Sequence, residues 1–216
     1  IETVFGGGTE LLVDGALATS VQSPPTAMVA VDGAGRLYVA RVSGTRVYRV
    51  DPSGVLTRYA GDGFSEIGFA GNGDPATDSS IGVLSAIAVS SSGVLYTSGL
   101  LNDFFTANTG QDFNRLRRVD TGGIINSIAN ARPAGLAAVD GMRVLGSANH
   151  RVREYSASGG SNTIAGTSTA GFQGDGGPAM SARLRDPAGF AVDSDGNLYI
   201  ADAGNNRVRR VDAVTG

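Results

Sequence analysis

Four copies of one short segment constrain the fold more than any other feature of this chain. They read RVYRVD at 46–51, RLRRVD at 115–120, RVREYS at 151–156 and RVRRVD at 207–212. A second segment precedes each copy, as VAVDGAGRLYVA at 29–40, IAVSSSGVLYTS at 87–98, FAVDSDGNLYIA at 190–201 and a shortened LAAVDGMRVLG at 136–146. Recurrence of one unit at spacings of tens of residues is typical of a repeat architecture.

The copies keep a constant register over long stretches. Residues 14–51 align with 175–212 at an offset of 161, without a gap. GFAGNGDPA at 68–76 matches GFQGDGGPA at 171–179 at an offset of 103. Such registers do not arise by chance, so the chain is built from repeats.

Each repeat predicts four short strands, named a to d here. Strand a is almost wholly apolar, b and c alternate apolar and polar residues, and d is of the SNTIAG type. Segments such as DSDG at 193–196 have the Asp and Gly content of a tight hairpin, which is why we expect a turn there rather than a calcium loop. Small antiparallel sheets must stack to bury their faces, and the radial solution is a β-propeller. The prediction is an all-β protein with four-stranded antiparallel blades.

Composition agrees with this fold and excludes several functions. The 216 residues include 33 glycines, only seven prolines and no cysteine, which indicates a turn-rich β protein and excludes disulfides and thiol catalysis. The net charge of −3 argues against nucleic acid as a partner. No run of 18 apolar residues exists, so we expect no membrane insertion. We expect a bacterial protein of the extracellular space or cell envelope.

The run PAGFAVDSDGNLYIADAGNNRVRRVD at 187–212 resembles an NHL repeat, which is a β-propeller blade. The other repeats depart from this pattern: Arg41 stands where the fourth repeat has Asp202, Gly99 is followed by an insertion, and NHRVR at 149–153 is a variant. The resemblance covers essentially the whole chain. It implies the fold but not one function, because NHL propellers serve many.

The resemblance also implies a role for the arginine-rich strands. In the family pattern the acidic residue of strand b faces the arginine that opens strand c, so Asp202 and Arg207 are expected to form a structural ion pair. Arg49, Arg118 and Arg210 are expected on the outer part of the blades, with their stems over apolar surface and their charged groups in solvent.

The two ends of the chain predict how the propeller closes. Ten residues separate the end of strand c from the end of strand d in three repeats, and four residues after Asp212 plus Ile1–Gly6 make the same ten. We therefore expect residues 1–6 to pair with 207–212 and close a single domain, 1–216, with repeats at 7–61, 62–130, 131–166 and 167–216 plus 1–6. The alternative is a part of a six-bladed or larger propeller.

Strand alternation predicts one loop-rich face. Because strands a to d alternate in direction, the b-to-c and d-to-a connections leave the same side of the blades. The long segments 62–84 and 167–187 and the insertion at 99–114 are of these two kinds. Within the insertion, Asn102 and Asp103 precede the adjacent aromatic residues Phe104 and Phe105, a candidate partner contact whose alternative is simple anchoring of a long loop. Phe69 and Phe172, in two d-to-a connections, are the second candidates.

Three equivalent polar residues in the d-to-a connections are weak metal candidates. Asp14, Asn72 and Asp175 are expected to cap backbone N–H groups, and a ring of their oxygens around calcium is the alternative. His150, the single histidine, occupies a turn position and is explained by turn chemistry. We expect no cofactor and no catalytic residue.

These observations favour a non-enzymatic interaction or scaffold module that binds a protein or a glycan with its loop-rich face. The alternative is a cation-dependent hydrolase or lyase of the NHL-like propeller type. An oligomer or a larger assembly is compatible with the sequence.

Overall fold

The chain folds into four antiparallel sheets that contain all sixteen strands of the described residues. The computed structural model describes residues 1–23, 27–64, 71–101 and 113–213. The first blade contains β1 (Ala27–Val31), β2 (Leu37–Arg41), β3 (Val47–Val50) and β4 (Leu56–Ala60). The second contains β6 (Val83–Val89), β7 (Leu95–Leu101), β8 (Phe113–Val119) and β9 (Ile124–Ala129), with the short β5 (Asp74–Pro75) outside β9.

The third blade contains β10 (Leu136–Ala138), β11 (Arg143–Ala148), β12 (Arg151–Ser156) and β13 (Ser161–Ala165). The fourth contains β14 (Pro187–Val192), β15 (Leu198–Asp202) and β16 (Arg207–Val211). Short 3-10 helices lie at η1 (Ala76–Asp78), η2 (Ala179–Ser181) and η3 (Ala203–Asn205). None of the helices in the described ranges is long and apolar enough to span a membrane.

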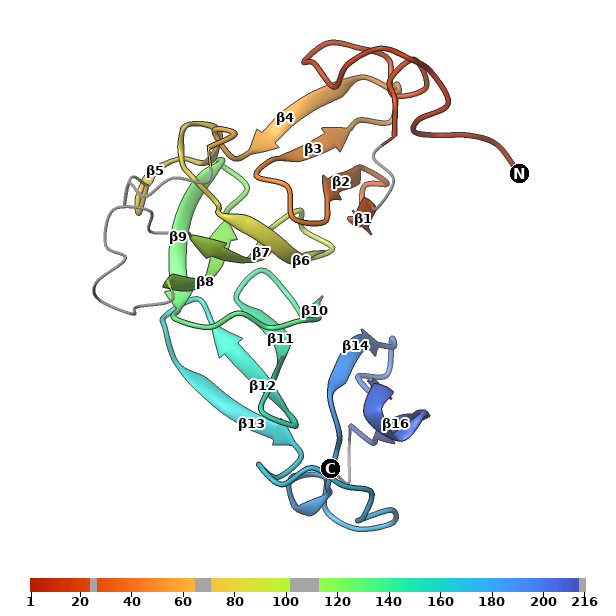
Figure 1. Ribbon diagram of the computed structural model, residues 1–216, viewed down its shortest axis with the longest axis vertical. Helices are drawn as coiled ribbons and strands as arrows, with labels where there is room; N and C mark the ends of the chain where they lie inside the picture. The colour runs from red at the N-terminus through yellow and green to blue at the C-terminus, as the bar shows by residue number, and fades with distance from the viewer. Residues whose placement is uncertain (24–26, 65–70, 102–112, 214–216) are drawn as a thin grey trace.

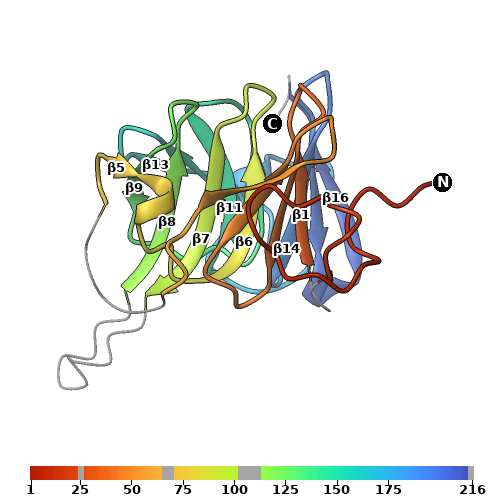
Figure 2. The same ribbon diagram turned by 90° about the horizontal axis from the view of Figure 1, so that it is seen from above.

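The four sheets follow one another around a common centre and form a four-bladed β-propeller, as predicted (Figure 1). The first strands β1, β6, β10 and β14 lie innermost and contact one another in succession, whereas β4, β9 and β13 lie outermost. Viewed from above, the blades stand side by side and the N-terminal segment projects away from them (Figure 2). All ladders between the named strands are antiparallel, with one isolated parallel bridge between Glu10 and Val21.

A side-chain oxygen holds each inner hairpin turn. Asp32 Oδ1 accepts hydrogen bonds from the backbone N–H groups of Ala34 and Arg36, both at 3.0 Å. Asp193 does the same for Asp195 and Asn197 at 3.0 and 2.9 Å. The DSDG segment is therefore a hairpin turn, as expected, with its first carboxylate bound to the backbone.

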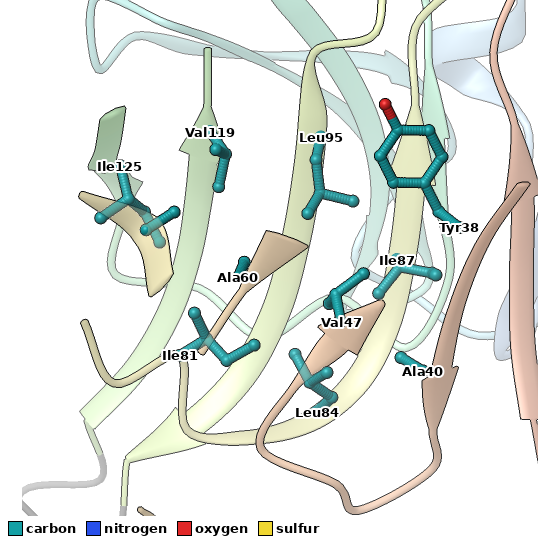
Figure 3. Packing of buried hydrophobic residues seen from close by; sticks show 11 residues of the cluster. Tyr38, Ala40, Val47, Ala60, Ile81, Leu84, Ile87, Leu95, Val119 and Ile125 are labelled. Carbon is teal, nitrogen blue, oxygen red and sulfur yellow. The ribbon is translucent and has the colours of Figure 1, made fainter. Parts of the chain in front are cut away.

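The hydrophobic core lies between neighbouring blades. Between the first and second blades, Tyr38 and Val47 pack with Leu84, Ile87 and Leu95 (Figure 3). Two further clusters join the second blade to the third and the third to the fourth. Alternate side chains of a strand point to opposite faces of its sheet. The apolar side chains of the strands therefore lie in the interfaces between neighbouring blades.

The predicted closure of the propeller by residues 1–6 is wrong. β16 pairs with β15 on one side, and the last sheet has three strands in the described residues. The backbone N–H of Gly6 instead donates to the carbonyl of Ala18 at 2.8 Å. Counting residues showed that residues 1–6 are equivalent to a fourth strand. The count does not say how far apart the first and last blades lie. In Figure 1 the N-terminal segment lies at the opposite end of the long axis from β16.

Candidate functional site

The arginines of the third strands are structural. Arg117 in β8 is 4% exposed and donates to the carbonyl oxygens of Ser80 at 2.6 Å and Gly71 at 2.7 Å, in the loop that precedes the same blade. Burial lowers the pKa of Arg117 to about 10, so it is charged at neutral pH. At the equivalent position of β3, Tyr48 donates its hydroxyl to the carbonyl of Leu12. These side chains hold the loops to the blades.

Asp202 is fully buried and lies at the centre of a polar cluster. It accepts hydrogen bonds from the Arg185 backbone N–H at 2.7 Å and from Asn205 Nδ2 at 2.8 Å. Its ion pair is with Arg209 at 3.5 Å. The structural role expected for Asp202 is therefore present, but the expected partner, Arg207, is wrong.

Arg207 contacts an aromatic ring and not Asp202. Its guanidinium lies 3.9 Å from the ring centroid of Phe172, and its Nη1 donates to the carbonyl of Asn205. Arg207 and Arg209 share one face of β16, because alternate residues of a strand do. The Asn205 side chain and the Phe172 ring therefore decide which of the two arginines reaches Asp202.

The outer arginines Arg49, Arg118 and Arg210 behave differently from one another. Arg49 lies 5.0 Å from the ring centroid of Tyr59, and Arg118 donates from Nε to the carbonyl of Gly141 at 2.8 Å. Arg210 is exposed and pairs with Asp212 at 2.5 Å. All three charged groups thus contact the protein, and Arg210 is the one that is largely exposed as expected.

The three metal candidates are not brought together. Asp14 Oδ1 accepts a hydrogen bond from the Arg58 backbone in the first blade, and Asn72 Oδ1 accepts one from Ser127 at 2.8 Å in the second. Both acceptors therefore cap the fourth strand of their blade, far from the centre. Asp175 pairs with Arg209 at 2.6 Å. No group of three His, Cys, Asp or Glu side chains able to hold a metal occurs in the described ranges.

A cleft of about 740 Å³ opens between the third and fourth blades on the loop-rich face. It is bordered by the connection from β9 to β10, the turn from β11 to β12 and the start of β14. Its lining includes Asn114, Arg132, Asn149, His150 and Asp186, with Tyr155 below them. Two d-to-a connections, from β9 to β10 and from β13 to β14, thus meet the b-to-c turn between β11 and β12, on the side that strand alternation predicted.

Three residues that line this cleft have a left-handed backbone conformation. Asn149 and His150 form the two-residue turn between Ala148 and Arg151, with φ of 47° and 62°, as a type I′ hairpin requires. Asp186 also has a left-handed φ, 48°, but in a connection rather than a hairpin. Left-handed non-glycine residues outside tight turns tend to cluster at functional sites.

His150 and Asp186 join the two blades across the cleft. His150 Nδ1 lies 3.4 Å from Asp186 Oδ1 and accepts a hydrogen bond from the Asp186 backbone N–H at 3.3 Å. The Asp186 side chain is 72% exposed. Arg132 is exposed and makes no hydrogen bond or ion pair within the described ranges. The cleft thus presents a cationic donor and an anionic acceptor to solvent.

Most predicted partner-binding residues lie outside the described residues. Phe69, Asn102, Asp103, Phe104 and Phe105 fall in the ranges 65–70 and 102–112. Phe172 is 41% exposed, and the guanidiniums of Arg207 and Arg209 cover its ring. Sequence reasoning did not identify Arg132 or Asp186. The only signal for either was its place in a connection on the loop-rich face.

Comparison with known proteins supports the fold and its repeats. A family model described as the NHL repeat matches residues 184–211. Human teneurin-1 is 50% identical over 40 residues, covering 18% of this chain and 2% of teneurin-1. Human teneurin-4 is 33% identical over 124 residues, covering 57% of this chain and 3% of teneurin-4. The chain therefore spans only a few per cent of the length of these relatives.

Solved structures resemble most of the chain. A streptogramin B lyase matches with a TM-score of 0.55 and 13% identity, over 90% of this chain and 54% of that one. An auxiliary nutrient binding protein from Bacteroides ovatus matches with a TM-score of 0.53 and 17% identity, over 88% and 48%. This chain thus spans about half the length of each, and at such identity the likeness shows the fold alone.

The radial sheets and these neighbours define a β-propeller. Its last repeat, within residues 184–211, matches the NHL repeat, and the relatives and the fold together support an NHL-repeat β-propeller.

Proposed function

We propose that this protein is a non-enzymatic binding module that takes a protein or glycan partner on its loop-rich face, centred on the cleft beside His150. The observation that carries the proposal is the pair of exposed, oppositely charged groups at the mouth of the cleft, Arg132 and Asp186. Arginine donors and carboxylate acceptors recognise the carboxylates, amides and hydroxyls that proteins and glycans share.

The contrast with the rest of the molecule supports this assignment. Several charged groups elsewhere in the repeats are bound to the framework, as Arg117 is by two carbonyls and Asp202 by Arg185 and Asn205. A charged residue bound on several sides stabilises the blade. A charged residue that is exposed in a cleft is available to a partner.

The insertion belongs to the same surface in this proposal. β7 and β8 remain paired up to Leu101 and Phe113, so the segment between them leaves the blade at a b-to-c connection, as the turn at Asn149 and His150 does. Asn114, the last residue of the insertion, lines the cleft. The predicted contacts at Phe104 and Phe105 therefore remain part of the proposed site.

The alternative, a cation-dependent hydrolase or lyase, would need several carboxylate or imidazole ligands side by side. The described part of the chain brings no three such groups together. One of the similar structures is titled a lyase and another a nutrient binding protein, so the shared fold does not choose between the two classes.

The test is binding to defined probes with matched variants. Labelled protein is applied to a glycan array and to a peptide array, and the positive probes are titrated. Arg132→Ala and Asp186→Ala should weaken binding about tenfold or more. The controls Arg143→Ala and Asp195→Ala change the same residue types at the turns between a and b strands, on the opposite face, and should bind as the wild type does. Equal binding by all four variants would contradict the proposed site.

A further inference from the structure

Arg132 and Asp186 occupy the same position in neighbouring repeats. Each directly precedes a PAG segment, at 133–135 in the third repeat and at 187–189 in the fourth. The inner strands β10 and β14 contact each other (Figure 1). A Cβ atom on Gly135 would collide with the carbonyl oxygen of Ala188, so the two backbones meet just after the two charged residues. Neighbouring repeats thus place a guanidinium donor and a carboxylate acceptor at equivalent points of one cleft.

Two serines hold the backbone that follows Arg132. The buried hydroxyl of Ser98 donates to the carbonyl of Pro133 at 2.8 Å, and the backbone N–H of Ala134 donates to Ser147 Oγ at 3.0 Å. The Arg132 guanidinium itself makes no hydrogen bond or ion pair within the described ranges. The backbone is therefore fixed while the charged group is open to a ligand, and a preorganised site loses less conformational freedom on binding.

Asp186 is fixed from the other side of the cleft. Its backbone N–H donates to His150 Nδ1 at 3.3 Å, and its φ is 48°. Its carboxylate is 72% exposed, and one oxygen lies 3.4 Å from the same imidazole nitrogen. A carboxylate has about four acceptor sites on its two oxygens. Most of the acceptor capacity of Asp186 is therefore available to a ligand.

Two side-chain amides add neutral polar groups to the cleft. Asn114 and Asn149 both line it, and neither amide makes a hydrogen bond in the part of the chain that the structure describes. An amide supplies two N–H donors and an acceptor oxygen. The cleft thus offers one guanidinium, one carboxylate and two groups that can donate or accept.

These groups specify the chemistry of a ligand. An arginine that lacks a carboxylate partner binds a carboxylate through two parallel N–H···O bonds. A hydroxyl group both donates and accepts, so it suits the Asp186 carboxylate and the two amides equally. A molecule with one carboxylate and several hydroxyl groups therefore satisfies every group, and a sugar acid is such a molecule. The volume of about 740 Å³ lies in the range of clefts that enclose drug-sized ligands, roughly 300–1,000 Å³.

We propose that this cleft binds a uronic-acid residue of an acidic glycan, with the carboxylate on Arg132 and the ring hydroxyls on Asp186 and the two amides. This inference rests on the proposed function and narrows its partner to one class. A concave cleft of this size encloses a small ligand, whereas a stable protein interface spreads over roughly 800 Å² of each partner. The geometry of the cleft therefore favours the glycan over the protein.

The test is calorimetric titration of the full chain with two probes of matched shape, trigalacturonic acid and its methyl ester. The ester keeps the rings and the hydroxyl groups but carries no charge. The wild type should bind the acid about ten- to a hundredfold more tightly, because only the acid forms charge-assisted hydrogen bonds with Arg132. Equal affinity for the two probes would overturn the proposal.

Variants assign the two halves of the ligand to the two charged residues. Arg132→Ala should bind the acid as weakly as the ester, and an Arg132→Ala variant that still prefers the acid would contradict the carboxylate contact. Asp186→Ala should weaken binding of the ester about tenfold, because the ester binds through its hydroxyl groups. Unchanged affinity for the ester would contradict the hydroxyl contact. Arg143→Ala, on the opposite face, is the control and should keep the wild-type preference, while far-UV circular dichroism checks that each variant is folded.

The outcome separates this inference from the proposed function. Suppose that a peptide or a neutral glycan on the arrays binds in a manner that depends on Arg132 and Asp186, while trigalacturonic acid does not bind. The cleft is then a binding site and the uronic acid is the wrong ligand. If no probe of any kind depends on these two residues, both the site and its ligand are wrong.

Discussion

Asp175 binds the guanidinium of Arg209 at 2.6 Å, on the same loop position from which Asn72 accepts a hydrogen bond from a fourth strand. The repeats thus use one polar position for two kinds of partner: a backbone N–H of the fourth strand in the first two blades, and a guanidinium in the described part of the fourth blade. In both cases the oxygen belongs to the framework of the blade.

Calcium is not expected to bind these oxygens, because each already accepts a hydrogen bond or an ion pair. Calorimetric titration of the protein with calcium should give no stoichiometric heat, and calcium should leave the melting temperature unchanged. A tight site abolished by Asp175→Ala would contradict this expectation and favour the cation-dependent class.

Asp202→Ala is expected to destabilise the protein by about 1–3 kcal/mol, because it leaves the Arg185 N–H and the Arg209 guanidinium without their buried acceptor. Arg207→Ala should cost less, about 0.5–1 kcal/mol, since it removes an exposed contact with Phe172. Urea unfolding followed by circular dichroism measures both. Equal losses of unfolding free energy in the two variants would instead favour an ion pair between Asp202 and Arg207.

Arg117→Met should lower the free energy of unfolding by about 1–3 kcal/mol, because the carbonyls of Gly71 and Ser80 lose their donor in a buried site. Arg118→Met is the matched control, since its guanidinium donates to the carbonyl of Gly141 and its side chain is partly exposed. If the two variants unfold at the same urea concentration, the loops do not depend on Arg117.

The acid stability of the protein should depend on Asp32, which is 5% exposed. Burial raises the pKa of this carboxyl, but hydrogen bonds from the Arg36 backbone, the Arg36 guanidinium and the Ala34 backbone lower it, and the net pKa lies below the usual 3.8. The unfolded chain therefore binds the proton more tightly. The stability that this carboxylate contributes is present above pH 3.8 and is lost as the pH falls through the folded value.

Asp32→Asn should consequently flatten the decrease of the urea midpoint below pH 4. Asp195→Asn changes an exposed carboxylate of an equivalent turn that makes no hydrogen bond in the described structure, and it should keep the wild-type slope. An unchanged slope in Asp32→Asn would assign the acid sensitivity to other carboxylates.

The repeats allowed most of the fold to be predicted, because strand alternation and turn residues are local properties. The turns at Asp32 and Asp193 and the capping by Asp14 and Asn72 follow from side chains and backbone a few residues or one aligned repeat apart. The prediction that residues 1–6 close the propeller was wrong because a residue count gives the pairing register of a strand but not the angle between neighbouring blades. Register alone does not bring residues 1–6 to β16.

The candidate site was harder to predict for a physical reason. His150 and Asp186 are 36 residues apart and meet only because two blades stand side by side. The partner of Asp202 depends on the path of η3 and on a ring from a distant loop, Phe172. Neither the contact between His150 and Asp186 nor the ion-pair partner of Asp202 can be predicted from the sequence of a single repeat.

The pairing of β7 and β8 has a practical consequence for engineering. The ladder holds its register through Leu95 and Val119 at one end and Leu101 and Phe113 at the other, so the hairpin is anchored before the inserted segment begins. Foreign sequences grafted in place of residues 102–112 would therefore be carried by a preformed stem, and this NHL-repeat protein offers a scaffold for displaying epitopes or selected loops.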